Sequence, residues 1–193
     1  MRVALVLLAA VSLTPALSAQ SSGRNDYTPT ARVVAGPEPG REAPSFTLPW
    51  ATKDTTSVAD YGYDLRSDRG KVVVLAFYPK DFTKSSSAQF QSFAQRRAEL
   101  FGPDVVVLGI SPDPIDTHRQ FAASLSLPFR LLSDPNQRVA GKYGSKSRDG
   151  APVRTVYVIG RDGKVTYRDL RFDPGSSKSL DRLKLAVEAA IHG

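Results

Sequence analysis

The sequence predicts an α/β fold, layered so that a mixed central sheet lies between helices. Strand-like apolar runs alternate with helix-like amphipathic segments in the first half of the domain, which favours parallel strands joined by helical crossovers. Two later strand patterns flank Asp162-Gly163, a dipeptide typical of a tight hairpin turn, and they add an antiparallel pair. The sequence shows no internal repeat and no second domain.

The first predicted elements follow from local patterns. Phe46 and its alternating neighbours predict a short edge strand between prolines, and residues 51–70 are polar and predict mostly loop. The continuous apolar run at 71–78 predicts a strand covered on both faces. A helix is predicted over 86–101, and a second buried strand over 105–110.

A second helix is predicted to open with Asp113 as its N-cap and Pro114 as its first residue, because both residue types favour those positions. The remaining elements are a strand over 129–132, a helix over 137–143, strands over 154–159 and 164–170, and a C-terminal helix that carries Leu180, Leu183 and Val187 on its apolar face.

The N-terminal residues have the composition of an export signal. In residues 1–19, Arg2 precedes an apolar run and then small residues that end at Ala19, which is the order of a secretory signal peptide. The run is shorter than the roughly 20 residues of an ordinary membrane span, so we expect cleavage after Ala19 and no span afterwards. An uncleaved anchor is the alternative. Residues 20–39 predict a flexible lead-in and 40–193 the folded domain, in a periplasmic or secreted location.

The composition excludes several kinds of chemistry. The 193 residues contain no cysteine, the single methionine is Met1, and the histidines are His118 and His192. Disulfides, thiolate nucleophiles and zinc–thiolate or iron–sulfur sites are therefore excluded, and we expect no metal and no cofactor. The net charge of +7 comes from 26 basic and 19 acidic residues, and the basic ones form no long run, so we expect no nucleic-acid binding.

The sharpest candidate site lies where the strand over 71–78 leads into the first helix. Ligands of open α/β sheets bind at this kind of edge, and the free N–H groups of a helix N-terminus attract anions. On spacing alone, however, the simpler interpretation is that Thr83 and the serines after it only cap the helix.

Several short motifs, in order, resemble those of a known family. Residues 72–83 (Val-Val-Val-Leu-Ala-Phe-Tyr-Pro-Lys-Asp-Phe-Thr) are similar to the peroxiredoxins, in particular the bacterioferritin comigratory protein branch of the thiol-specific antioxidant family. Residues 40–48 follow that family's opening Gly-x-x-Ala-Pro-x-Phe-x-Leu, and further motifs continue to residue 170. The resemblance implies a thioredoxin-like three-layer sandwich and, for the family, reduction of peroxides by a thiol that a thioredoxin-type reductant regenerates.

The family signature Pro-x-x-x-Thr-x-x-Cys maps onto Pro79, Thr83 and Ser86, and the arginine of the family's pocket maps onto Arg154. The peroxide-reducing cysteine is therefore replaced by Ser86. The resemblance implies that these four residues form the pocket, with Thr83, Ser86 and Arg154 at the catalytic positions.

Two further positions also depart from the family. Gln91 stands where this branch often keeps a resolving cysteine, and Gln89 stands where a glutamate is often found. A serine hydroxyl is a far weaker acid than a thiol and has no sulfenic acid form, so we expect the family's peroxidase activity to be absent. What remains is at most a pocket for a peroxide or a small anion, and a thioredoxin-type reductant would act only if a cysteine were restored at Ser86.

Other interpretations stay open at this point. The chain is alternatively a genuine thioredoxin-dependent peroxiredoxin whose catalytic cysteine was deliberately changed to Ser86, or a protein with a structural role whose oligomeric state the sequence does not assign. Arg154 is alternatively held by local carboxylates in a relic pocket. Hydrolysis by Ser86 is disfavoured, because the Gly-x-Ser-x-Gly elbow is absent, His192 lies next to the end of the sequence and His118 is expected on a helix surface.

Overall fold

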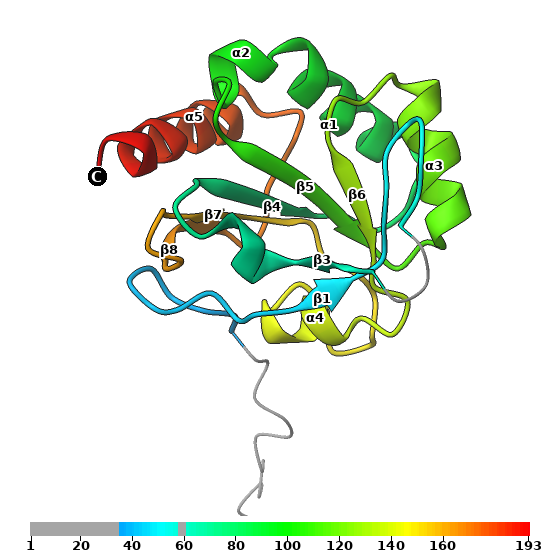
Figure 1. Cartoon of the computed structure of the whole chain (residues 1–193), viewed down its shortest axis with the longest axis horizontal. Helices are drawn as coiled ribbons and strands as arrows, with labels where there is room; N and C mark the ends of the chain where they lie inside the picture. The colour runs from blue at the N-terminus through cyan, green and yellow to red at the C-terminus, as the bar shows by residue number, and fades with distance from the viewer. Residues whose placement is uncertain (1–34, 58–60) are drawn as a thin grey trace, which may run out of the picture. The chain divides into compact units, whose positions relative to one another are not determined.

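The computed structural model describes residues 35–57 and 61–193. The predicted signal peptide and most of the predicted lead-in lie outside these residues. The main feature is a six-stranded sheet in the order β2-β6-β5-β4-β7-β8 (Figure 1). Its strands are β2 (Trp50–Ala51), β4 (Val73–Phe77), β5 (Val106–Ser111), β6 (Arg130–Ser133), β7 (Thr155–Ile159) and β8 (Val165–Asp169).

The sheet is mixed, as the sequence predicts. β4 pairs in parallel with β5, and β5 with β6, which are the two crossovers expected for the first half of the domain. β7 pairs antiparallel with β4 and with β8, and the hairpin turn at Asp162-Gly163 places Gly163 at φ +78°. All five residues of β4 are buried, because this strand lies in the interior of the sheet and is covered on both faces.

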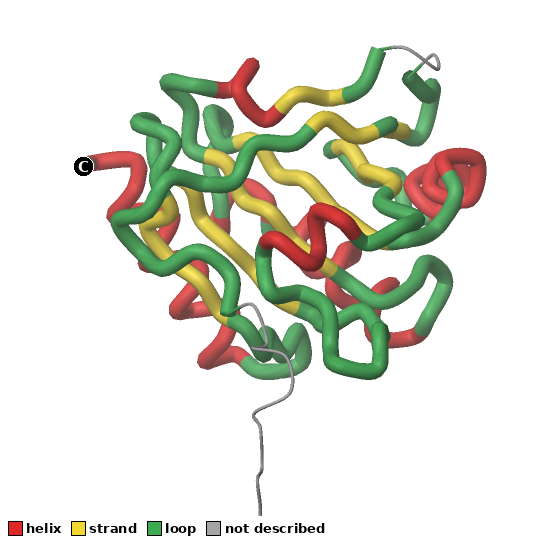
Figure 2. Tube along the Cα trace, turned by 90° about the horizontal axis from the view of Figure 1, so that it is seen from below, coloured by secondary structure: helices red, strands yellow, loops and turns green. Residues whose placement is uncertain are grey.

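Helices lie on both sides of the strand layer (Figure 2). One face packs against α1 (Lys84–Gln95), α2 (Arg97–Leu100), α3 (Ile115–Ser124) and α5 (Ser177–His192). The other face packs against α4 (Arg138–Lys142), the two-stranded sheet of β1 (Thr47–Leu48) and β3 (Tyr63–Asp64), and the short 3-10 helix η1 (Leu65–Asp68). The predicted three-layer α/β architecture is confirmed. None of the helices that the structure describes is long and apolar enough to span a membrane.

A glycine allows α1 to approach the sheet closely. A Cβ atom on Gly109 of β5 would lie 2.9 Å from the ring of Phe90, so any side chain there would push α1 away. Phe90 and Phe93 are completely buried under the helix and contact each other edge to face, with ring centroids 6.1 Å apart. This close packing fixes the position of α1 relative to the sheet.

Residues 51–70 are mostly loop, as predicted, and they also contain β3 and η1, because Tyr63 and Leu65 are buried in the core. Two other local predictions are wrong. The helix predicted over 86–101 begins earlier, at the Thr83 cap, and is divided into α1 and α2 at Arg96, which has φ −100° and ψ 17°.

The second wrong prediction concerns the start of α3. Pro114 is the N-cap itself rather than the first helical residue, and Asp113 does not cap the helix. The Asp113 carboxylate instead accepts hydrogen bonds from the Ser111 hydroxyl (2.7 Å) and from the backbone N–H of Asp81 (2.8 Å). These partners compete with capping, and the bond from Asp81, 32 positions away, is one that no local pattern records.

The chain already joins the sheet just before the predicted start of the domain. The carbonyl oxygen of Gly36 accepts a hydrogen bond from the Arg168 guanidinium (2.9 Å), and Gly40 N–H donates to the carbonyl oxygen of Val165 (2.7 Å). The described residues 35–39 of the predicted lead-in therefore contact the rest of the fold through β8.

Candidate functional site

The candidate site begins at the turn between β4 and α1. Thr83 is the N-cap of α1, and its Oγ1 accepts a hydrogen bond from the backbone N–H of Ser86 (3.3 Å). The side chains of Thr83 and Ser86 also share a hydrogen bond of 2.9 Å between their hydroxyls. The capping role that the sequence favours for Thr83 is therefore present, and it places Ser86 in the first turn of the helix, with no exposed surface.

Arg154 reaches this turn through the register of the sheet. Phe77, the last residue of β4, pairs with Thr155, the first residue of β7, so Arg154 enters at the end of the sheet where β4 leads into α1. Its Nη2 atom donates to the hydroxyls of Ser85 (3.1 Å) and Ser86 (3.3 Å). Residues 68 positions apart in the sequence therefore meet at one point, as the predicted pocket requires.

Gln89 completes the contacts of Arg154. It lies one turn after Ser86 on α1 and is completely buried. Its Oε1 atom accepts a hydrogen bond from Nη1 of Arg154, whereas its Nε2 atom has no hydrogen-bond partner. This amide orientation is the physically sensible one, because the opposite orientation would turn two N–H donors toward the guanidinium donors.

The groups around Arg154 carry no formal negative charge within ion-pair distance. Within residues 35–57 and 61–193, no carboxylate forms an ion pair with Arg154, so the predicted alternative of a relic held by carboxylates is not what the structure places there. Burial lowers the pKa of Arg154, while the more distant Tyr78 and Asp173 act in the opposite direction. The guanidinium nevertheless remains a cation at neutral pH, since its ordinary pKa is above about 12.

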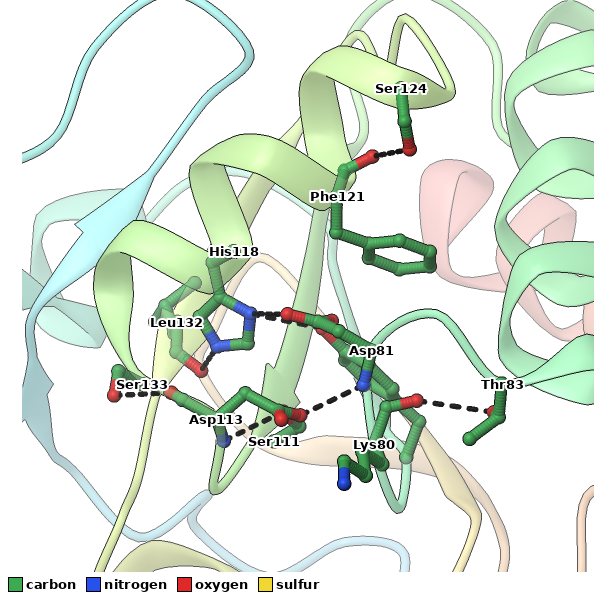
Figure 3. A network of polar contacts seen from close by, with 11 residues as sticks. Lys80, Asp81, Thr83, Ser111, Asp113, His118, Phe121, Ser124, Leu132 and Ser133 are labelled. Atoms are coloured by element: carbon green, nitrogen blue, oxygen red, sulfur yellow. Dashed lines mark hydrogen bonds and ion pairs between the residues drawn. The ribbon is translucent and has the colours of Figure 1, made fainter.

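A second polar cluster contacts the turn between β4 and α1 through Asp81 (Figure 3). The Asp81 carboxylate accepts from the Tyr78 hydroxyl (2.7 Å) and lies 2.7 Å from Nδ1 of His118, while Nε2 of His118 lies 3.1 Å from the carbonyl oxygen of Leu132. Both ring nitrogens therefore face oxygen atoms of neighbouring residues. His118 is 0% exposed, which corrects the expectation that it lies on a helix surface.

This cluster joins three elements to the turn. The backbone N–H of Asp81 donates to Asp113, next to α3, and His118 connects α3 to β6. Burial, followed by the charge of Asp81, raises the pKa of Tyr78 well above its usual value, so this hydroxyl stays a donor. The role of Asp81 is not among the predictions from the sequence; its signal was a carboxylate four residues after the end of the fully buried β4.

Neither histidine is placed to act as a general base for Ser86. Both nitrogens of His118 are occupied by Asp81 and Leu132, and His192 is exposed at the end of α5. Hydrolysis with Ser86 as the nucleophile therefore lacks its proton acceptor. The part of the chain that the structure describes also contains no group of three histidine or acidic side chains able to hold a metal ion.

The other predicted positions lie on the same turn and helix. Pro79 is half-buried at the start of the turn, and its role in shielding the pocket stays a prediction. Gln91, at the position expected for a resolving cysteine, is exposed on α1. The exposed Phe82 has φ +56°, in the left-handed region, and its ring packs edge to face on Phe121 at 5.1 Å between centroids.

The fold and this junction together define a thioredoxin-like protein of the peroxiredoxin type. Residues 39–168 match the AhpC/TSA family. The chain belongs to this family, as its motifs predict.

Individual relatives agree with the family match. The chain is 36% identical over 136 residues to a putative peroxiredoxin bcp of Coxiella burnetii, covering 67% of this chain and 85% of the relative. It is 28% identical over 156 residues to peroxiredoxin Bcp of Bacillus subtilis, covering 76% of this chain and 95% of the relative.

Among solved structures, the bacterioferritin comigratory protein of Xanthomonas campestris superposes with a TM-score of 0.65 at 22% identity, over 79% of this chain and 98% of that one. A Plasmodium vivax 2-Cys peroxiredoxin superposes with a TM-score of 0.68 at 23% identity, over 80% of this chain and 96% of that one. These two likenesses concern the fold, and they agree with the predicted thioredoxin-like sandwich.

Proposed function

We propose that this chain is a peroxiredoxin homologue that has lost thiol peroxidase activity and binds a small anion between Ser86 and Arg154. The family reaction requires a thiolate that attacks the O–O bond and becomes a sulfenic acid. The sequence contains no sulfur atom after Met1, so no side chain can take that role.

The charge balance of the pocket supports the anion-binding part of the proposal. A thiolate at position 86 and a carboxylate at position 89 would each offset the charge of Arg154. Here both positions are neutral, and the buried Nε2 of Gln89 has no acceptor. Leaving a buried donor unsatisfied costs about 1–3 kcal/mol. The half-buried guanidinium of Arg154 has no ion-pair partner among the described residues, and Asp173 acts on it only from a distance beyond an ion pair. An anion supplies both the missing charge and the missing acceptor.

The type of anion follows from the donors. The guanidinium of Arg154 is a planar fork that suits a carboxylate or another small oxyanion, and the hydroxyls of Ser85 and Ser86 lie beside it. A helix N-terminus adds the positive end of its dipole. Formate and nitrate are therefore suitable probes. We also propose that the protein acts outside the cytoplasm, which rests on the signal-peptide pattern of residues 1–19.

The test combines peroxide consumption with anion binding. We expect the purified protein to consume no hydrogen peroxide in the presence of dithiothreitol or a thioredoxin system, and we expect formate or nitrate to raise its thermal unfolding temperature. At a free anion concentration of about 100 times Kd, binding adds about 2.7 kcal/mol to the unfolding free energy. Catalytic loss of peroxide in metal-free buffer would disprove the first part.

Three variants locate the anion. Arg154→Gln should abolish the stabilisation, and Gln89→Glu should strongly reduce it, because the new carboxylate pairs with Arg154 from within. Arg148→Gln removes the same charge from an exposed position away from the pocket and should leave the stabilisation unchanged. If all three variants respond like the original chain, the anion does not bind at Arg154 and the second part of the proposal is wrong.

A further inference from the structure

A groove adjoins the proposed anion pocket and shares Arg154 with it. It has a volume of about 720 Å³, with the first two turns of α1 on one side and residues 172–175 on the other. Arg154 contacts both sides, because its Nη2 atom donates to the Ser85 hydroxyl (3.1 Å) and its carbonyl oxygen accepts from the N–H of Phe172 (3.2 Å). A ligand held at Arg154 therefore has room to extend into this groove.

Asp173 supplies the one carboxylate among the residues lining the groove, all of which belong to the described part of the chain. The backbone before it is anchored, because Phe172 is buried and its ring packs edge to face on Phe93, with centroids 6.0 Å apart. Oδ1 of Asp173 accepts a hydrogen bond from the N–H of Gly175 (2.9 Å). The carboxylate is thereby held at the side of the groove that faces α1.

Asp173 acts on Arg154 without pairing with it. Neither Asp173 nor Lys84, which lines the opposite side of the groove, forms an ion pair with any residue that the structure describes. Burial lowers the pKa of Arg154, whereas Tyr78 and Asp173 act in the opposite direction, so the charge of Asp173 reaches the guanidinium. The groove thus presents a cation and an anion, close together but separate, to the same ligand.

This pair of charges distinguishes between kinds of carboxylate. A simple carboxylate bound at Arg154 is attracted by the guanidinium and repelled by Asp173. A carboxylate with an ammonium group on the adjacent carbon atom is attracted at both ends. Ala88, which is exposed, and Pro174, which is half-buried, give the groove apolar surface on both sides for a small side chain of such a ligand.

We propose that this site binds a free α-amino acid with a small apolar side chain, its carboxylate at Arg154 and its ammonium group at Asp173. The inference rests on the proposed anion binding, and it narrows the ligand from small anions in general to zwitterions. A peptide fits less well, because its free ammonium and carboxylate groups lie on different residues, whereas a single amino acid carries both on one carbon atom.

The test compares L-alanine with propionate, which has the same carbon skeleton and lacks the ammonium group. In isothermal titration calorimetry at neutral pH, the original chain should bind L-alanine about threefold more tightly, the effect of one partly exposed ion pair. Asp173→Asn keeps an oxygen for the N–H of Gly175 and should abolish this preference, by weakening the binding of L-alanine and strengthening that of propionate. Asp181→Asn removes the same charge from an exposed position of α5 outside the groove and should preserve the preference.

A second measurement uses the original chain alone. Nuclear Overhauser contacts from the methyl group of bound L-alanine should reach Ala88 and Pro174. The inference is wrong if propionate binds as tightly as L-alanine, if Asp173→Asn leaves the preference unchanged, or if the methyl contacts lie elsewhere. In each of these cases the proposed anion binding still stands when Arg154→Gln abolishes the binding of propionate. If the original chain binds neither compound, the anion binding and the amino-acid specificity are both wrong.

Discussion

The substitution Ser86→Cys tests whether the pocket still has the geometry that activates a thiol. The position is fully buried in the first turn of α1, its backbone N–H is bonded to Thr83, and Arg154 Nη2 lies 3.3 Å from its side-chain oxygen. Serine and cysteine differ by one atom, so we expect the fold to tolerate the change. The chain has no other cysteine, and every thiol signal would therefore come from this position.

The size of the expected effect follows from the charge at Arg154. At the recorded 3.3 Å and an effective dielectric constant of about 20, a thiolate and the guanidinium attract by about 5 kcal/mol, which corresponds to between three and four pKa units. Burial of the site opposes ionisation, and measured effects of one adjacent opposite charge are about 1–3 units. We therefore expect the pKa of the introduced thiol to fall from about 8.5 to roughly 5.5–7.5.

The thiolate absorbance in the ultraviolet, followed against pH, measures this pKa directly. Addition of Arg154→Gln should raise it again, and Ser87→Cys, one residue further along the same helix, serves as the matched control that should titrate closer to 8.5. With dithiothreitol present, the Ser86→Cys thiolate should attack hydrogen peroxide, release water or hydroxide and become a sulfenic acid, which two reductant thiols return to the thiol. A thiol with an ordinary pKa and no reaction with peroxide would show that the pocket does not activate this position.

Two further predictions concern the buried polar groups. Asp81→Ala removes the acceptor of both the Tyr78 hydroxyl and the His118 ring and should lower the unfolding free energy by about 1–3 kcal/mol for each buried group left unsatisfied. Adding His118→Gln should then cost less than the sum of the single changes, and additive losses in chemical denaturation would contradict this. Burial raises the pKa of Tyr78 well above the usual 10 and that of Tyr157 to about 12. Because the pKa of each phenol is higher in the folded state than in the unfolded state, its contribution to stability is fully present below about pH 10 and is lost as the pH rises further. Phenolate absorbance and circular dichroism should therefore change together above that pH. Ionisation of these tyrosines near pH 10 without unfolding would refute the assignment.

The elements that the sequence predicts correctly are those whose signal is local. The apolar run of β4 and the Asp162-Gly163 turn of the β7–β8 hairpin each lie within a few neighbouring residues. The proximity of Ser86 and Arg154 is different, because it depends on the register between β4 and β7, and only the family motifs indicated it beforehand.

The elements that sequence analysis missed depend on contacts between distant segments. His118 looks like an exposed polar residue on an amphipathic helix until Asp81, 37 positions earlier, is placed against its ring. The basic residues are scattered along the chain, yet the strand order brings Arg130 and Arg161 to the same edge of the sheet as Lys71. No spacing pattern in one sequence contains the pairing of strands that creates such neighbours.

The loss of redox chemistry and the proposed gain of anion binding have the same physical cause. If only the cysteine at position 86 were replaced, a glutamate at position 89 would still offset the charge of Arg154, and the pocket would not need an anion. If only the glutamate at position 89 were replaced, a thiolate at position 86 would offset that charge instead. Because Ser86 and Gln89 are both neutral, neither offsets the charge of the half-buried Arg154 guanidinium. Ser86→Cys and Gln89→Glu should therefore each weaken anion binding, whereas only Ser86→Cys should restore a reaction with peroxide.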